Sequence, residues 1–298
     1  MKINLQNINT SSNSGPNSFA KKLIPELNQL GCSFVPPEQS ELSLCFIETN
    51  HRSGKPLIQR LDGIYFNKDF DYNSQNKNIR STYEHASGVI YQSNFNEKLI
   101  SKYFGEHKHS IVIHNGANLL EISKSTPMKN DKYDNIWSCA ASWRPHKRLT
   151  SNIKYFLEQS GPRDLLIVAG HVPESDKLID EKIVYFGELS QNQLYSLYKS
   201  STYFLHMAYL DHCPNVVVDA RACGSHIICT DAGGTMEIAG LNATIIEEEE
   251  VWDFEPTKLY SPPPLDFTKK KKNHFDACYD MKVVATRYKE FMEKVKCQ

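Results

Sequence analysis

The sequence contains no apolar run that approaches the roughly 18–20 residues needed to span a membrane. Its first residues, Met1–Leu5, lack the apolar core of a secretory signal, so we expect a cytoplasmic protein. Excess charge is also absent, because 34 Lys and Arg stand against 35 Asp and Glu, for a net charge of −1. No global positive field therefore draws the chain to nucleic acid or to an anionic membrane, and any anion must be bound locally.

Motifs that would assign a metal or a dinucleotide cofactor are missing too. None of the eight cysteines forms a C-x-x-C pair, and no histidines stand at metal-ligand spacing. We therefore expect no metal site, with the cysteines reduced and mostly buried. No G-x-G-x-x-G follows Ile8 or Ala140, which end two predicted strands. This absence argues against a nicotinamide-dependent oxidoreductase.

What the sequence does contain is typical of a globular α/β protein. Hydrophobic residues make up 40% and charged residues 23% of a chain of 298 residues, which is long enough for two domains. Short apolar strands alternate with segments of helical periodicity, a pattern that predicts βαβ units and parallel sheets. We predict one domain in residues 1–122, a polar linker in residues 123–134 and a second domain in residues 135–275. A C-terminal helix in residues 276–298 could pack back on the first domain.

One predicted helix start lies between two carboxylates. Pro214 suits the first position of a helix, because its missing N–H would be unpaired there. The free N–H groups of Asn215 and Val216 would then form an anion site beyond the end of a strand. Asp211 precedes this helix, and Asp219 lies in its second turn with its side chain tilted back toward the helix start. Two acids around an anion site suit a ligand with phosphates in the middle and hydroxyl groups at both ends, as in a nucleotide-sugar.

Two loops at the ends of nearby strands could complete this site. Gly233 and Gly234 allow backbone N–H groups to approach a ligand closely, and Thr235 could cap the helix that follows. Arg144 and Lys147 follow the first strand of the second domain. Cations near a helix start oppose the helix dipole by ~0.3–1 kcal/mol each, so we expect an anion beside them. We predict that they stabilise a departing diphosphate.

The order of these motifs resembles the glycosyltransferases of family 4, which have the GT-B fold of two Rossmann-like domains with parallel sheets facing a central cleft. Their signature is an acid, seven residues, a second acid, a small-residue helix ending in Gly, and then Gly-Gly-x-x-Glu. Here it corresponds to Asp211, Asp219, Gly224 and Gly233–Glu237. The resemblance extends to the loop Ser14–Asn17, to Ile113–Gly116 and to the C-terminal helix.

The resemblance implies a retaining transferase that moves a sugar from a nucleoside-diphosphate sugar, with UDP or GDP expected, to a hydroxyl of a glycan, lipid-linked or small-molecule acceptor. It implies neither a metal nor a further cofactor. Asp211 would contact the sugar hydroxyls, Asp219 the ribose, and Arg144 with Lys147 the diphosphate. Gly15, in the loop of small residues, would close on the phosphates. The other implied donor-binding residues are Pro214, Asn215, Val216, Gly233, Gly234, Thr235, Glu237 and His212.

This sequence also departs from the family pattern. Both family glutamates are aspartates here, one methylene shorter. The family arginine stands five residues before the lysine, where this chain has Ser142, so we infer that Arg144 takes its role. The first domain is short, with little room for an acceptor pocket. These departures leave open an alternative, a non-catalytic nucleotide-sugar-binding subunit of a glycosyltransferase complex.

Three further features have two interpretations each. Asp62 follows a strand of the first domain and either acts on the acceptor or sugar as a catalytic residue, or caps a turn before Gly63. The triplet Asp69–Asp71 matches the D-x-D of metal-dependent glycosyltransferases but is interpreted as a loop. The run Lys269–Lys272 is interpreted as a solvated linker. At ~1 kcal/mol per basic residue it would give at most peripheral membrane contact.

Overall fold

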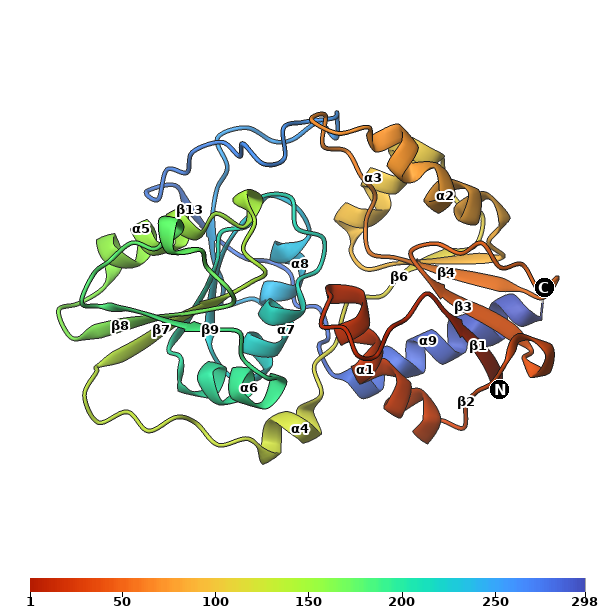
Figure 1. The fold of residues 1–298 in the computed structure, drawn as a ribbon, viewed down its shortest axis with the longest axis horizontal. Helices are drawn as coiled ribbons and strands as arrows, with labels where there is room; N and C mark the ends of the chain where they lie inside the picture. The colour runs from red at the N-terminus through yellow and green to blue at the C-terminus, as the bar shows by residue number, and fades with distance from the viewer. Residues whose placement is uncertain (298) are drawn as a thin grey trace. The chain divides into compact units, whose positions relative to one another are not determined.

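A computed structural model describes residues 1–297 and divides the chain into two compact units. Unit 1 contains residues 1–117, residues 254–257 and the chain from Cys278 onward. Unit 2 contains residues 118–253 and 258–277, so that residues 123–134, expected as a linker, lie within it. Each unit is an α/β domain around a parallel sheet (Figure 1), which confirms the predicted fold class.

Unit 1 is built around a six-stranded sheet with the order β2-β1-β3-β4-β5-β6, in which all neighbours are parallel. Helices α1 and α9 cover one face, and α2 and α3 cover the other (Figure 1). The strands are β1 (Lys2–Gln6), β2 (Ser33–Phe34), β3 (Leu42–Phe46), β4 (Leu57–Leu61), β5 (Gly88–Tyr91) and β6 (Ser110–Val112). The helices are α1 (Gly15–Gln29), the 3₁₀ turn η1 (Pro37–Gln39), α2 (Tyr72–His85), α3 (Asn94–Phe104) and α9 (Met281–Lys296).

The last helix, α9, is part of the core of unit 1. Its apolar stripe includes Val284, Tyr288 and Phe291, which are buried together with Phe19 of α1 and Ile3 of β1. Parallel strands need apolar cover on both faces, and α9 supplies it beside α1.

Helix α1 includes most of the loop Ser14–Asn17. Gly15 is its first residue, with Ser14 as the N-cap and Pro16 in the first turn. Proline is favoured there because its ring presets a helical φ. The predicted loop Ser14–Asn17 is therefore the cap and first turn of α1, which places the exposed Gly15 at a helix N-terminus.

Unit 2 is built around a seven-stranded sheet with the order β13-β12-β11-β10-β7-β8-β9. All of its neighbours are parallel except β12 and β13. The strands are β7 (Asn135–Ala140), β8 (Asp164–Ala169), β9 (Ile183–Gly187), β10 (Tyr203–His206), β11 (His226–Thr230), β12 (Thr244–Ile246) and β13 (Lys270–Lys272). The helices are α4 (Leu119–Lys124), η2 (Pro145–Lys147), α5 (Leu149–Gln159), η3 (Glu174–Asp176), α6 (Gln191–Ser200), α7 (Asn215–Ala222) and α8 (Thr235–Ala239).

Helix α5 packs on one face of this sheet, and α6, α7 and α8 pack on one another and on the strands from the other side. On the α5 side, Phe156 is buried against Trp137, at a ring-centroid distance of 5.7 Å, and against Leu166. This arrangement leaves the carboxyl ends of β7, β10 and β11 open for loops that carry polar residues, as in other doubly wound sheets.

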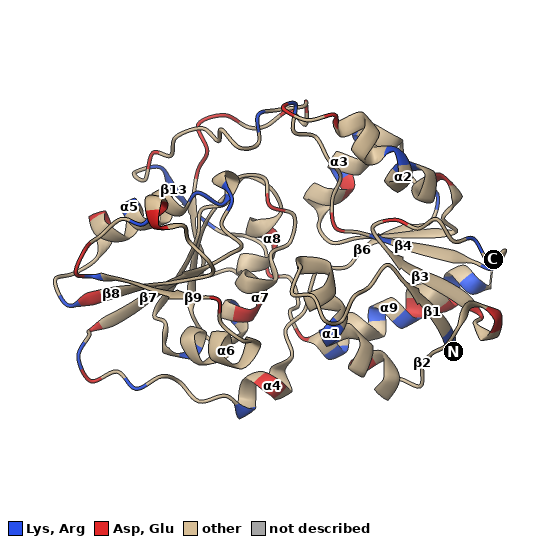
Figure 2. Ribbon diagram, in the orientation of Figure 1, with Lys and Arg blue, Asp and Glu red and all other residues tan. Residues whose placement is uncertain are grey.

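The lysine run does not form the predicted solvated linker. Lys270–Lys272 form the edge strand β13, antiparallel to β12. Lys271 donates to Asp231 at 2.6 Å and lies 3.3 Å from Glu247, so neighbouring acids partly neutralise the run. Charges of both signs are spread over each unit (Figure 2).

Candidate functional site

The candidate site of unit 2 lies where three loops follow strands β7, β10 and β11. The first loop carries Lys147, the second Asp211 and the third Gly233 with Gly234. Because these strands are parallel and share one sheet, their carboxyl ends meet at one edge. All three loops belong to unit 2.

Asp211 is the residue on which the loops converge. Its Oδ2 accepts from the Nζ of Lys147 and lies 2.9 Å from Nε2 of His206, the last residue of β10. Its Oδ1 accepts from the backbone N–H of His212 at 3.0 Å. Lys147 and Asp211 keep 18% and 14% of their side-chain surface exposed, so the ion pair is nearly dry but still reachable.

These partners decide the charge of Asp211. Burial by itself would raise the pKa of the carboxyl, but the Lys147 ammonium and the His206 hydrogen bond outweigh it and hold that pKa well below its usual range. Burial lowers the pKa of His206, although its bond to Asp211 opposes this shift. A neutral His206 that faces a carboxylate must carry its proton on Nε2.

Two further histidines of the site are held neutral. Burial, reinforced by Lys147, lowers the pKa of His146 to about 3. Burial also lowers the pKa of His212 to about 4, against the pull of Asp211. Neither is charged near neutral pH, so Lys147 supplies the positive charge that is closest to Asp211.

Gly233 brings the third loop against Asp211. The N–H of Gly234 donates to the carbonyl oxygen of Asp211 at 2.7 Å, and Gly233 pairs with Asp211 in a parallel β-bridge. Gly233 has a φ of +88°, and a Cβ there would lie 2.8 Å from the backbone nitrogen of Asp211. Only glycine permits this approach, which explains the Gly-Gly pair physically.

Asp219 has surroundings different from those of Asp211. It is buried in α7 and accepts from Nε2 of Gln191, the first residue of α6, at 3.2 Å. The first residue of α7 is Asn215 rather than Pro214, which has an extended ψ of 121° and forms the N-cap. The predicted helix start is therefore correct to within one residue.

Thr235 does not cap α8 as predicted. Gly234 is the N-cap, and Thr235 is the first helical residue, buried with no hydrogen-bond partner for its Oγ1. Glu237 is also buried in this short helix. Arg144 is exposed before the 3₁₀ turn η2, which ends at Lys147, and helix α5 starts at Leu149.

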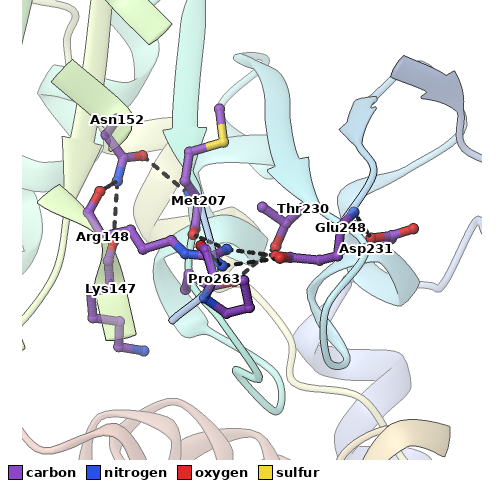
Figure 3. Close-up of polar contacts among 9 residues, drawn as sticks. Lys147, Arg148, Asn152, Met207, Thr230, Asp231, Glu248 and Pro263 are labelled. Carbon is purple, nitrogen blue, oxygen red and sulfur yellow. Dashed lines mark hydrogen bonds and ion pairs between the residues drawn. The ribbon is translucent and has the colours of Figure 1, made fainter. Parts of the chain in front are cut away.

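Arg148 links the loops of this site, and sequence reasoning did not identify it. Its guanidinium donates two hydrogen bonds to Glu248, from Nη1 to Oε1 at 2.5 Å and from Nη2 to Oε2 at 3.0 Å (Figure 3). Nη2 also donates to the carbonyl of Pro263 at 2.8 Å. Asn152 donates to the carbonyls of Lys147 and Arg148 and accepts from the N–H of Met207, which joins the β7 loop to the β10 loop.

In unit 1, Asp62 is paired with a buried arginine. Arg60, 1% exposed at the end of β4, forms an ion pair with Asp62, which is 15% exposed. The Arg60 guanidinium also donates to the side chains of Asn115 at 2.8 Å and Tyr288 at 3.1 Å. Asp62 therefore compensates a buried charge, a role that the turn-capping interpretation did not contain. The triplet at 69–71 ends in the N-cap of α2, where Asp71 accepts from the N–H of Ser74 at 3.0 Å.

Arg60, Arg148 and His206 are the polar residues that sequence reasoning missed. Each stands inside or beside an apolar strand or helix, where the only signal is a charged or polar residue in a buried segment. Several partners of the two arginines lie far away in the sequence, up to 228 residues for Arg60 and Tyr288, whereas Asp62 follows Arg60 closely and Asp211 is five residues from His206.

Two kinds of feature are absent from the part of the chain that the structure describes, a cluster of metal ligands and a membrane-spanning helix. Within residues 1–297, no group of three or more His, Cys, Asp or Glu side chains is arranged to hold a metal ion. None of the helices described has the length and apolar character needed to cross a membrane.

Comparisons with known proteins show what this chain is similar to. Residues 126–255 match the family model of glycosyl transferases group 1, whereas no curated protein matches the chain. Sucrose-phosphate synthase from Thermosynechococcus elongatus is similar in structure, with a TM-score of 0.73 and 11% identity over 99% of this chain and 98% of that one. Alr3699/HepE from Anabaena in complex with UDP-glucose has a TM-score of 0.66 and 14% identity over 99% and 100%. WaaG, a glycosyltransferase involved in lipopolysaccharide biosynthesis, has a TM-score of 0.63 and 12% identity over 99% and 98%.

These structures share one fold with the present chain across nearly its whole length. The resemblance to GT-B glycosyltransferases inferred from the sequence is thereby confirmed. The protein has the GT-B fold of two Rossmann-like domains, and its residues 126–255 match the model of glycosyl transferases group 1.

Proposed function

We propose that the protein is a glycosyltransferase that moves a sugar from a nucleoside-diphosphate sugar to a hydroxyl acceptor in the cytoplasm. The observation that carries the proposal is the Lys147–Asp211 pair, nearly dry at the carboxyl ends of the strands and packed against Gly233 and Gly234. The match to glycosyl transferases group 1 and the similarity to a protein solved with UDP-glucose support it.

In this proposal, different residues of unit 2 bind different parts of the donor. An ammonium group has three N–H donors, so Lys147 can keep its bond to Asp211 and still donate to a phosphate oxygen. Arg144, which is exposed and close to Lys147 in the sequence, places a second positive charge beside the diphosphate. The first N–H groups of α7, at Asn215 and Val216, place the positive end of the helix dipole there. Asp211 would accept from a sugar hydroxyl, and Asp219 from the ribose.

The reaction we propose retains configuration and uses no metal. The bond between the anomeric carbon and the diphosphate oxygen breaks, with its electron pair leaving on the diphosphate. The acceptor oxygen bonds to the same face of the anomeric carbon, and its proton passes to the departing phosphate. The Lys147 ammonium stabilises the charge that develops on the leaving group. Family 4 membership and a glycan, lipid-linked or small-molecule acceptor belong to the same proposal.

One observation favours a second candidate, a subunit that binds the donor without transferring it. The carboxylate of Asp211, shorter by one methylene than the family glutamate, already accepts from Lys147, His206 and its neighbour's N–H. A carboxylate with three donors has less capacity left for a sugar hydroxyl.

A donor screen tests both candidates. The purified protein is mixed with UDP-, GDP-, ADP- and TDP-sugars, with and without EDTA, and its melting temperature and donor hydrolysis are measured. At 100 times its dissociation constant a donor stabilises the fold by ~2.7 kcal/mol. We expect one base to be selected, with slow hydrolysis that EDTA leaves unchanged. A shift without any hydrolysis or transfer would favour the binding subunit, and no shift with any donor would contradict both.

A further inference from the structure

The two loops that meet in the Lys147–Asp211 pair each contain a residue with a left-handed backbone. Arg148, directly after Lys147, has a φ of +50°, and Leu210, directly before Asp211, has a φ of +55°. Neither is a glycine, and an L-residue with a side chain is strained in this conformation. Such conformations persist only where surrounding contacts impose them.

At Arg148 these contacts come from its own side chain. The guanidinium is 3% exposed and Glu248 is 5% exposed, and two parallel bonds join them. The ring of Tyr209 lies 5.0 Å from the guanidinium carbon. The carbonyls of Met207 and Pro263 accept further hydrogen bonds from the guanidinium (Figure 3). The planar guanidinium and its two parallel bonds therefore hold the backbone of Arg148, directly after Lys147, in its left-handed conformation.

Glu248 carries this constraint on to the glycine loop. Its backbone N–H donates to Oδ1 of Asp231 at 2.8 Å (Figure 3), and Lys271 holds the other oxygen of Asp231 at 2.6 Å. Asp231 is two residues before Gly233. The chain Arg148–Glu248–Asp231 therefore connects the loop of Lys147 with the loop whose N–H groups pack on Asp211.

We propose that Arg148 and Glu248 are positioning residues, which hold the Lys147 loop and the Gly233–Gly234 loop in the relative placement that binds a nucleoside diphosphate. This inference rests on the proposed function. A glycine at position 148 would adopt the left-handed backbone without strain, so what arginine adds there is its side-chain contacts, above all the two bonds to Glu248. Removing it leaves Glu248 a buried carboxylate without its partner, and both loops lose a common anchor.

The test compares binding of UDP and uridine, or of GDP and guanosine, by calorimetry. Both members of a pair contain the base and the ribose, but only UDP and GDP contain the diphosphate. The difference in affinity within a pair therefore measures the contribution of Lys147 and the Gly233–Gly234 loop. The variants are Arg148→Gly, which relieves the backbone, Arg148→Lys, which keeps the charge but not the planar guanidinium, and Glu248→Gln. Arg163→Gly is the matched control, because Arg163 forms an exposed ion pair with Asp134 in the same unit.

We expect each of the three variants to bind the diphosphate roughly 10- to 100-fold more weakly at a temperature well below its melting point, with nucleoside binding unchanged. Backbone amide exchange should accelerate in residues 231–235 of Arg148→Gly, far along the chain from the substitution. Arg163→Gly should match the wild type in both measurements.

Equal losses for diphosphate and nucleoside, or a lower melting temperature with diphosphate binding intact, would show a structural role only and overturn the inference. Arg148→Lys keeps the test decisive where Arg148→Gly does not fold. If the wild type binds neither UDP nor GDP, the proposed function itself is contradicted. The positioning inference is separately contradicted when the wild type binds one of them and the variants bind it equally well.

Discussion

Nε2 of His206 lies 2.9 Å from Oδ2 of Asp211, the oxygen that also accepts from the Lys147 ammonium. The ring is buried at the end of β10 and neutral, so it fixes the carboxylate without competing with Lys147 as a charge. His206→Ala removes one of the donors that hold Asp211, and we predict a fall of about tenfold in kcat/KM. His206→Gln, which keeps an N–H donor, should recover part of the loss.

His226 provides the control for this prediction. It stands at the start of β11, bonded to Oγ1 of Thr244 at 2.9 Å, and its pKa is also lowered by burial. His226→Ala should change stability without changing kcat/KM. Equal kinetic effects of the two alanine variants would mean that the histidine at 206 acts through the fold alone.

The Lys147–Asp211 pair predicts the largest kinetic effects. Lys147→Ala removes the ammonium that faces the leaving diphosphate in the proposed reaction, and Asp211→Ala removes the carboxylate that holds this ammonium in place. Each should lower turnover ~10²–10³-fold, the usual consequence of losing one preorganised charge contact. Lys154→Ala, at an exposed position of α5 in the same unit, should leave turnover unchanged. Wild-type turnover in both site variants would remove these residues from the mechanism.

Gly233→Ala tests the close approach between the glycine loop and Asp211. A Cβ at position 233 would overlap the backbone of Asp211, in addition to the strain of a φ of +88°. Gly224 has a φ of +97°, and a Cβ there would meet no other atom within 4 Å, so Gly224→Ala carries the backbone strain alone. We predict a loss of diphosphate binding in Gly233→Ala only, measured by calorimetry with UDP or GDP. Equal binding in the two variants would contradict the steric argument.

The agreement between sequence and structure depends on the range of the interactions involved. Alternating apolar segments predicted both parallel sheets, because burial leaves a local period in the sequence. Helix α2 (Tyr72–His85) was missed, since its buried face includes Asn76 and Thr82 in place of larger apolar residues. The motifs of the site were readable for the same local reason, as Asp211, Lys147 and the glycine pair each follow a strand.

The contacts that organise the site were not readable. Arg148 and Glu248 are 100 residues apart, and neither lies in a motif. The left-handed backbone at Arg148 is invisible in a sequence, where only glycine or asparagine would have signalled it. The same holds for His206, which terminates an apolar strand without any local pattern that assigns it to Asp211.

The buried histidines predict a loss of stability in acid. His146 and His212 have folded-state pKa values of about 3 and about 4, against 6.5 when unfolded. Below pH 6.5 the unfolded chain therefore binds protons that the folded chain does not, and the free energy of unfolding falls as the pH falls toward 4. Each group contributes at most ~1.4 kcal/mol per pH unit in that range. Urea denaturation between pH 7 and 4.5 should show a shallower decline in His212→Gln, and an identical decline would refute the assignment.

The Arg60–Asp62 pair predicts that stability and turnover can be separated. Asp62→Asn leaves the buried guanidinium with hydrogen bonds to Asn115 and Tyr288 but without its carboxylate, and loss of one partner of a buried pair costs ~3–5 kcal/mol. Combining it with Arg60→Met removes the unpaired charge, so urea denaturation should show most of that stability restored. Glu255→Gln, in the exposed pair with Lys102, should cost less than ~1 kcal/mol.

Turnover of the same double variant decides between the two roles of Asp62. If Asp62 acts on the acceptor or the sugar, the Arg60→Met/Asp62→Asn protein is stable but slow, because the carboxylate is still absent. If Asp62 serves only to compensate Arg60, turnover returns together with stability. We predict the first outcome, since Asp62 keeps 15% of its side-chain surface exposed at the carboxyl end of β4, where ligands of parallel sheets bind. Turnover equal to that of the wild type in the double variant would assign Asp62 to the fold.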